Sequence, residues 1–391
     1  MSDLTPQTSA SSRDGMRDSP VAPTITGEPV AATIEPTVEQ TTIDVDDGAS
    51  DSITTDDQMY ANLGASMSRA VVGQRLNLTG PRTRPRSHPQ LWIIRLSTAV
   101  IIMHSVLELD VAYNFPNDED EMDRLDLVHT LMVKTVGNKI FLAHVDGAKL
   151  HRVLDVGTGT SIWSVEMGDF FPNAEIIGND LSAIQPKWVP PNVKFEIDDV
   201  ESEWVGRNKY DFIFSRYLSG SLADWPTYVK RVSQNLNPGG WAEFQDWSFM
   251  FRSDDGTLEG AAIQRWTDTF MDACKVFGRD AQISPKLEGL VRENTDLINV
   301  HHEPFKIPNG PWPKDAHLRD LGMCNLIQLL EGLEGFSLKL LCGGLAWTKK
   351  EVLVLCSQVR TELKSGKVHA CYHYDVVYGQ KPKKEEASQH V

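Results

Sequence analysis

The sequence predicts an α/β fold: a doubly wound, mostly parallel, seven-stranded sheet with helical additions and a disordered N-terminal arm. The main observation is a regular alternation from about position 150, where short apolar runs and helical segments form five units in about 100 residues. The second observation is that the first run, RVLDV, passes directly into the glycine turn GTGT and then a helix. Strand–turn–helix units of this kind build parallel sheets with right-handed crossovers.

Each expected strand is a short apolar run rich in β-branched or aromatic residues. The five parallel strands are expected at 152–156, 174–180, 192–199, 210–216 and 241–247. A later strand is expected at 300–308, and the last one, at 371–380, should close the sheet as the antiparallel seventh strand. Apolar residues at helical spacing predict amphipathic helices at 258–277, 317–336 and 349–364.

Residues 1–59 are expected to form a disordered acidic arm. They carry twelve acidic and only two basic side chains, so they hold −10 of the net charge of −16, and they contain no Phe, Trp or Tyr. Such a segment cannot bury enough apolar surface to offset the entropy lost on ordering. A solvating extension is favoured over an acidic interaction arm.

Residues 60–112 form an anomalous basic and apolar region. No acidic residue occurs from 69 to 107, four arginines cluster around PRTRPRSHP, and the apolar run LWIIRLSTAVIIMHSVL follows. A membrane helix needs about 20 apolar residues, so this interrupted run favours a buried or partner-binding helix over membrane contact. The main domain is then expected at 113–383, followed by a polar tail at 384–391.

Charge and cysteine content exclude several classes of protein. The net negative charge argues against broad binding to nucleic acid or to anionic lipid. The five cysteines form no CxxC pair, which favours a reducing compartment, cytoplasmic or nuclear, over a disulfide framework or a cysteine-rich zinc site. The first residues, MSDLTPQTSA, have no basic or apolar region typical of a secretory signal.

Glycines and carboxylates stand where the first three strands end. Gly157 and Gly159 follow the first strand, and glycine lets the backbone turn sharply and approach a ligand closely. Asp180 ends the second strand, 21 residues after Gly159, where a carboxylate can accept both hydroxyls of a ribose. Asp199 ends the third strand. The sequence therefore predicts a nucleoside-binding site at this edge of the sheet.

The register of the glycines separates two kinds of nucleoside cofactor. In the dinucleotide pattern G-x-G-x-x-G, the third glycine is replaced by Ile162, which disfavours a NAD-linked oxidoreductase. The pattern D-x-G-x-G fits Asp155, Gly157 and Gly159, with Ser161 where a third glycine would follow. Together with the spacing of the later aspartates and of NPGG, this pattern indicates S-adenosyl-L-methionine, which has no phosphate to bind.

The longer strings carry a resemblance to a known family. VLDVGTGTSIW, GNDLSAIQPKWVPPNVKFEIDDVESEW, DFIFSRYLSGSLADW and LNPGGWAEFQDW resemble the fungal LaeA-like methyltransferases, class I enzymes and regulators of secondary metabolism that use S-adenosylmethionine. The resemblance extends from FPNDEDEMDRLDLVH to VVYGQKP, roughly 113–383. Family members usually have glycine in place of Ser161. They also have a short Tyr-rich stretch where this chain has residues 69–111. Residues 69–111 are either a genuine elaboration or translated intron sequence.

The resemblance and the chemistry together imply the cofactor-binding residues Asp155, Gly157, Gly159, Asp180, Asp199, Val200 and Arg216. Asp155 should brace the glycine loop and approach the methionine ammonium group. Asp180 should bind the ribose hydroxyls, and Asp199 with the backbone of Val200 should read the adenine edge. Arg216 should lie beside the methionine half of the cofactor.

The candidates for a catalytic base are His129, Tyr217 and Asp246. A base is needed only when the methyl acceptor must lose a proton. A lone helical histidine such as His129 is more often structural. No metal is expected, because His301 and His302 are adjacent on a strand and so face opposite sides.

The resemblance implies a methyltransferase acting on a small-molecule intermediate of a secondary-metabolite pathway. The competing expectation is a LaeA-like nuclear regulator that acts through protein partners. A methylated product that disappears with the gene would favour the first, and stable protein partners without turnover would favour the second.

Overall fold

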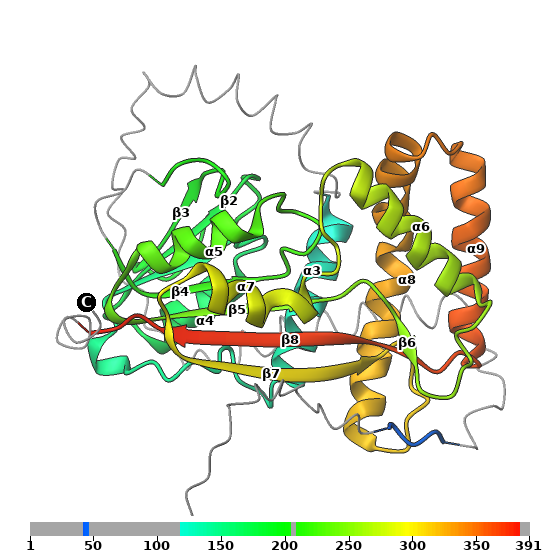
Figure 1. Ribbon diagram of the computed structural model, residues 1–391, viewed down its shortest axis with the longest axis horizontal. Helices are drawn as coiled ribbons and strands as arrows, with labels where there is room; N and C mark the ends of the chain where they lie inside the picture. The colour runs from blue at the N-terminus through cyan, green and yellow to red at the C-terminus, as the bar shows by residue number, and fades with distance from the viewer. Residues whose placement is uncertain (1–41, 47–117, 205–208, 384–391) are drawn as a thin grey trace, which may run out of the picture. The chain divides into compact units, whose positions relative to one another are not determined.

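The computed structural model describes residues 42–46, 118–204 and 209–383 (Figure 1). The anomalous region 60–112, the tail 384–391 and most of the arm 1–59 lie outside the described residues. One part of the arm differs from the expectation of disorder. Val45 forms an antiparallel bridge with Pro313, with backbone hydrogen bonds from Asp46 to Trp312 (2.9 Å) and from Lys314 to Asp44 (3.0 Å). Residues 42–46 are therefore paired with the segment that precedes helix α8 (Ala316–Gly344).

The central sheet has the predicted doubly wound topology. Its parallel strands follow the order β3-β2-β1-β4-β5, and their bounds are β1 Arg152–Val156, β2 Glu175–Asp180, β3 Val193–Ile197, β4 Tyr210–Arg216 and β5 Leu236–Trp247. The last strand, β8 (Ala370–Gln380), is antiparallel to β5, as predicted. It lies between β5 and the edge strand β7 (Ile298–Pro308). A two-residue strand, β6 (Arg252–Ser253), also pairs with β8 and was not predicted.

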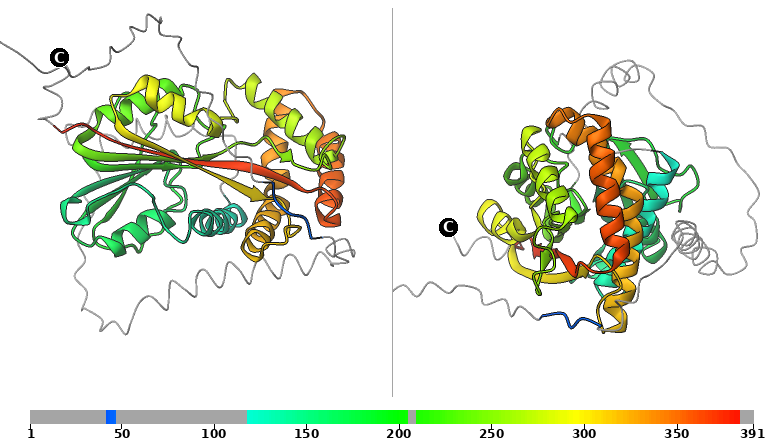
Figure 2. Two further views of the ribbon diagram at one scale, coloured as in Figure 1. Left: turned by 60° about the horizontal axis from the view of Figure 1, so that its bottom comes forward. Right: turned by 90° about the vertical axis from the view of Figure 1, so that its right-hand side faces the viewer.

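Helices cover both faces of the sheet (Figure 2). The helices are α3 Glu119–Thr135, α4 Ile162–Phe170, α5 Trp225–Gln234, α6 Ala262–Val276, α7 Leu287–Asn294, α8 Ala316–Gly344 and α9 Lys349–Ser365. Side chains alternate along each strand, so Phe212 and Phe214 of β4 join the core beneath α3 and α4, whereas Ile213 joins the core beneath α5 and α7. Both faces of the central strands β1, β4 and β5 are thus largely buried, as a parallel sheet requires.

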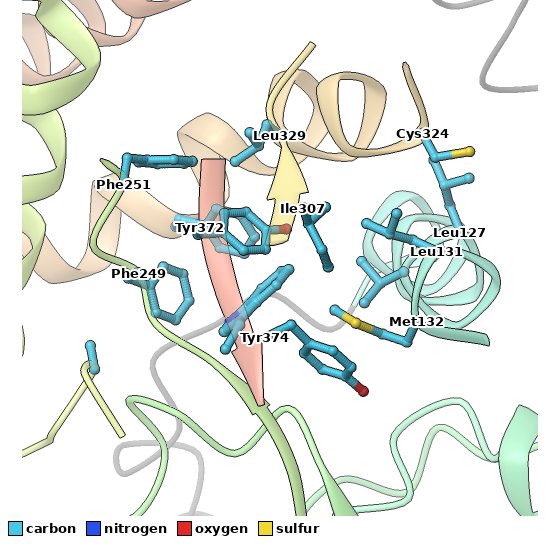
Figure 3. Packing of buried hydrophobic residues seen from close by; sticks show 14 of the residues in the cluster. Leu127, Leu131, Met132, Phe249, Phe251, Ile307, Cys324, Leu329, Tyr372 and Tyr374 are labelled. Atoms are coloured by element: carbon cyan, nitrogen blue, oxygen red, sulfur yellow. The ribbon is translucent and has the colours of Figure 1, made fainter. Parts of the chain in front are cut away.

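Helices α6, α8 and α9 pack together beside the sheet (Figure 1). The indole of Trp266 on α6 donates to the hydroxyl of Ser337 on α8 (2.8 Å), and both side chains are buried. Figure 3 shows where α8 meets the sheet: Leu329 of α8 lies near Ile307 of β7 and Tyr372 of β8. Helix α8 continues eight residues beyond the predicted end at 336. Helix α7 was not predicted, because its eight residues give barely two turns of periodicity.

The paired histidines of β7 face opposite sides of the sheet, as predicted. His301 stacks on Tyr378, with ring centroids 5.1 Å apart. The Nε2 atom of His302 lies 2.6 Å from an Oδ1 atom of Asp375. Among the described residues, no group of three or more His, Cys, Asp or Glu side chains is arranged to hold a metal ion. None of the described helices is long and apolar enough to cross a membrane.

Candidate cofactor site

A cavity lies at the carboxyl ends of β1, β2 and β4, where a doubly wound sheet binds its ligands. All seven residues expected to bind the cofactor line it: Asp155, Gly157, Gly159, Asp180, Asp199, Val200 and Arg216. Helix α3 contributes one wall through Leu125, Val128 and His129. The structure therefore brings these seven residues, from four separate segments of the chain, to one cavity.

The glycine loop after β1 is held by Asp155. The Oδ2 atom of Asp155 accepts hydrogen bonds from the hydroxyls of Thr158 (2.6 Å) and Ser164 (2.7 Å). Burial raises the pKa of Asp155. Gly157 has a φ of 68°, and a Cβ atom there would lie 2.6 Å from Cδ2 of Leu218, which also lines the cavity. Glycine therefore permits both the positive φ and the close approach of Leu218.

Asp180 connects the end of β2 to the glycine loop. One carboxylate oxygen accepts the backbone N–H of Gly159 (2.8 Å), and the other accepts that of Ser182 (2.9 Å). Burial raises the pKa of Asp180. A carboxylate has about four acceptor sites, so Asp180 can still accept from a hydroxyl group of a ligand in the cavity.

The turn after β3 brings two carboxylates to the cavity, Asp198 and Asp199. Asp199 accepts the backbone N–H of Glu201 (2.9 Å) and so fixes the turn that presents Val200. Burial raises the pKa of Asp198. A planar polar ring bound in the cavity can therefore meet the backbone of this turn and the carboxylate of Asp199.

The structure separates the three candidates for a catalytic base. His129 and Tyr217 line the cavity, but Asp246 is not among the residues that do. The Asp246 carboxylate instead accepts the backbone N–H groups of Leu218 (2.8 Å) and Trp247 (2.9 Å), and burial raises its pKa to about 7. The expectation that Asp246 acts on the ligand is therefore corrected: Asp246 holds the loop that follows β4.

Tyr217 has an unusual backbone conformation. Its φ is 65°, a region that bulky side chains rarely occupy. The Asp246 bond to Leu218 and a bond from the Tyr217 N–H to the Gln245 carbonyl (3.0 Å) hold it there. Burial raises the pKa of its phenol, so Tyr217 stays protonated at neutral pH. The phenol oxygen is itself buried, so Tyr217 is part of the cavity wall rather than a ready base.

Sequence reasoning missed an ion pair at the cavity rim. Arg279, in the segment after α6, lies 2.6 Å from the carboxylate of Glu201, and both residues line the cavity. The other oxygen of Glu201 accepts the backbone N–H of Ala223 (2.7 Å). The partners are separated by 78 residues, and neither lies in a motif, so no local signal pointed to them.

Ser161, at the position where the family usually has glycine, is strained. It has a φ of 66°, and its hydroxyl is buried without a hydrogen-bond partner among the described residues. We expect Ser161→Gly to raise the free energy of unfolding by about 1 kcal/mol, because it relieves the backbone strain and removes the buried hydroxyl that lacks a hydrogen bond. Chemical denaturation measures the change. Ser161→Ala, which removes the hydroxyl but keeps the strained φ, should give a smaller gain, and an equal gain would contradict the strain.

The cavity fits a nucleoside without phosphates. The arginines among its lining residues are Arg216 and Arg279, of which Arg279 is paired with Glu201, and carboxylates outnumber them: Asp155, Asp180, Asp198, Asp199 and Glu201. A pyrophosphate would need cationic or backbone donors free to receive it. A glycine cradle with carboxylates at three strand ends suits S-adenosyl-L-methionine, whose charges are an ammonium, a carboxylate and a sulfonium.

Comparison with known proteins agrees with this geometry. A family profile described as "Methyltransferase domain" matches residues 103–281. Methyltransferase pytC of Aspergillus terreus is 43% identical over 274 residues, which cover 69% of this chain and 84% of pytC. The secondary metabolism regulator LAE1 of Cochliobolus heterostrophus is 32% identical over 278 residues, 69% of this chain and 90% of LAE1. A solved structure of Haemonchus contortus phosphoethanolamine N-methyltransferase 2 with S-adenosyl-L-methionine matches with a TM-score of 0.36 and 13% identity, over 73% of this chain and 57% of that one.

Proposed function

We propose that this chain, which belongs to the S-adenosylmethionine-dependent methyltransferases related to pytC and the LaeA-like proteins, methylates a small-molecule intermediate of a secondary-metabolite pathway. The observation that carries the proposal is the cavity at the strand ends, lined by all the residues expected to bind the cofactor. The identity to pytC, named a methyltransferase, is higher than the identity to the regulator LAE1, which favours the enzyme over the regulator. The proposed compartment is the cytoplasm or the nucleus.

The residues of the cavity divide between the parts of the cofactor. In our proposal Asp180 accepts the two ribose hydroxyls, and Asp199 with the Val200 N–H binds the adenine edge. Asp155 and the glycine loop receive the amino-acid part, with Arg216 beside it. When bound, the cofactor supplies an electrophilic methyl carbon on a sulfonium.

The chain's own contribution is to position the acceptor and to exclude water. Leu125 and Val128 give α3 an apolar wall. In-line displacement at carbon depends mainly on such positioning. An acceptor whose nucleophilic atom carries a free lone pair at neutral pH fits these residues, because His129 and Tyr217 are not poised to take a proton.

A labelled-cofactor assay tests the proposal. Purified protein is incubated with methyl-labelled S-adenosylmethionine and a small-molecule extract from a strain that lacks the gene. We expect label in a new small-molecule product, and no label with the Asp180→Ala variant. If the protein binds the cofactor but labels no small molecule from any extract, and instead holds stable protein partners, the regulatory alternative replaces this proposal.

A further inference from the structure

Helix α3 is linked to the cofactor cavity mainly through one histidine. His129 is 4% exposed, and its two ring nitrogens face different elements. Its Nδ1 atom lies 2.7 Å from an Nη2 atom of Arg216 at the end of β4, and its Nε2 atom lies 3.1 Å from the Glu166 carboxylate on α4. A second link is the hydroxyl of Thr160, which donates to Asp126 of α3 (2.7 Å).

The partners of His129 decide which nitrogen carries its proton. A guanidinium group can only donate hydrogen bonds, so Nδ1 must accept the bond from Arg216. The proton is therefore on Nε2, where it is donated to Glu166. The neutral ring satisfies both partners at once. A protonated ring would turn an N–H toward Arg216 and place two positive charges side by side.

We propose that His129, in its neutral form, is a positioning residue that fixes α3 as a wall of the cofactor cavity and aims Arg216 at the bound cofactor. The inference rests on the proposed function, because it assigns a role within the same site. It replaces the expectation that His129 is a catalytic base. The lone pair that a base would use already accepts the bond from Arg216.

The charges around His129 favour the neutral ring. Burial is the largest influence and lowers the pKa of His129, and Arg216 on β4 lowers it further. Glu166 on α4 and Asp126 on α3 act in the opposite direction but do not outweigh them. A histidine with a lowered pKa contributes stability above its unfolded pKa and loses it as the pH falls through the folded value. The hydrogen bonds of His129 to Arg216 and Glu166 are therefore intact at neutral pH and are lost in acid.

Two substitutions separate positioning from catalysis. In His129→Gln, the amide oxygen can accept from Arg216 and the amide nitrogen can donate to Glu166, but the side chain does not titrate. In His129→Leu, both bonds are lost. The pH dependence of S-adenosylhomocysteine binding is measured by calorimetry from pH 7.5 to 4.5, beside kcat and KM for methyl transfer at pH 7.5. His151→Gln, which changes an exposed histidine outside the cavity, is the matched control.

We expect His129→Gln to bind S-adenosylhomocysteine like the wild type at pH 7.5 and to lose less affinity in acid. Asp155 and Asp180 also have raised pKa values, so they make binding depend on pH in both proteins. The contribution of His129 is therefore the difference between the pH curves of the variant and of the wild type. His129→Leu should bind about tenfold more weakly at pH 7.5. His151→Gln should follow the wild-type pH curve. A His129→Gln variant with intact binding but a kcat reduced 100-fold or more would restore the base and overturn the proposal.

A measurement that needs no ligand distinguishes this inference from the proposed function. Amide hydrogen exchange in α3 should rise in the wild type as the pH falls, after correction for the intrinsic rate, and should change less in His129→Gln. If the wild type fails to bind S-adenosylhomocysteine, the proposed function is wrong, but hydrogen exchange still tests whether His129 fixes α3. Equal pH dependence in the two proteins overturns the inference, even if His129→Leu does not fold.

Discussion

Asp180→Ala is expected to weaken the binding of S-adenosylhomocysteine by about 100-fold or more. The carboxylate holds the N–H groups of Gly159 and Ser182 and is proposed to accept both ribose hydroxyls. Hydrogen bonds to a charged acceptor contribute roughly 1.5–3 kcal/mol each, so the loss of two ligand bonds alone accounts for a factor of this size. Titration calorimetry with the purified protein measures the change.

A matched control is available at the opposite end of the strands. Asp211 also accepts two backbone N–H groups, those of His151 (2.8 Å) and Arg152 (3.0 Å), but it does not line the cavity. Asp211→Ala should therefore lower the stability by a similar route and leave cofactor affinity within about threefold. Equal losses of affinity in the two variants would show that Asp180 acts through stability and does not contact the ligand.

Gly322→Ala is expected to lower the free energy of unfolding by about 3 kcal/mol or more. Gly322 is buried in α8, and a Cβ atom there would lie 2.0 Å from the carbonyl oxygen of Gly310. The obstacle is backbone, so either the helix or the turn must move, and overpacking of this kind typically costs 1–3 kcal/mol or more. Thermal denaturation should show a fall in Tm of about 6 °C or more.

Gly343→Ala provides the comparison within the same helix. A Cβ atom at Gly343 would lie 3.4 Å from Cζ of Phe277, close to ordinary contact. Alanine favours a helix over glycine by about 1 kcal/mol, so this variant should be as stable as the wild type or more stable. A similar loss of stability in both variants would contradict the close approach of α8 to the turn at Gly310.

The strands, and the convergence of the seven candidate cofactor residues on one cavity, were predictable because their signals are local. Asp155, Gly157 and Asp180 belong to a strand–turn–helix unit and the strand after it, and the parallel topology brings their ends together. All the residues predicted to bind the cofactor line one cavity for this reason. The strain at Ser161 could also be anticipated, because the family's glycine marks a backbone conformation that serine adopts at a cost.

The rest of the site depends on contacts that no local pattern encodes. Arg279 reaches Glu201 from a segment 78 residues away, so neither residue stands out in the sequence. Asp246 was predicted as a base from its place at the end of β5. Its hydrogen bond from Leu218, in the loop that follows β4, is visible only in the packed structure. The role of His129 depends on two partners from different elements, Glu166 and Arg216.

The measurement that tests the account most directly is a competition titration of the wild-type chain with S-adenosylhomocysteine and NADH at pH 7.5. The account predicts micromolar binding of S-adenosylhomocysteine that NADH does not displace, because carboxylates outnumber the cationic side chains that line the cavity and disfavour a pyrophosphate. A folded protein that binds NADH in preference would contradict the assignment of the cavity to S-adenosylmethionine.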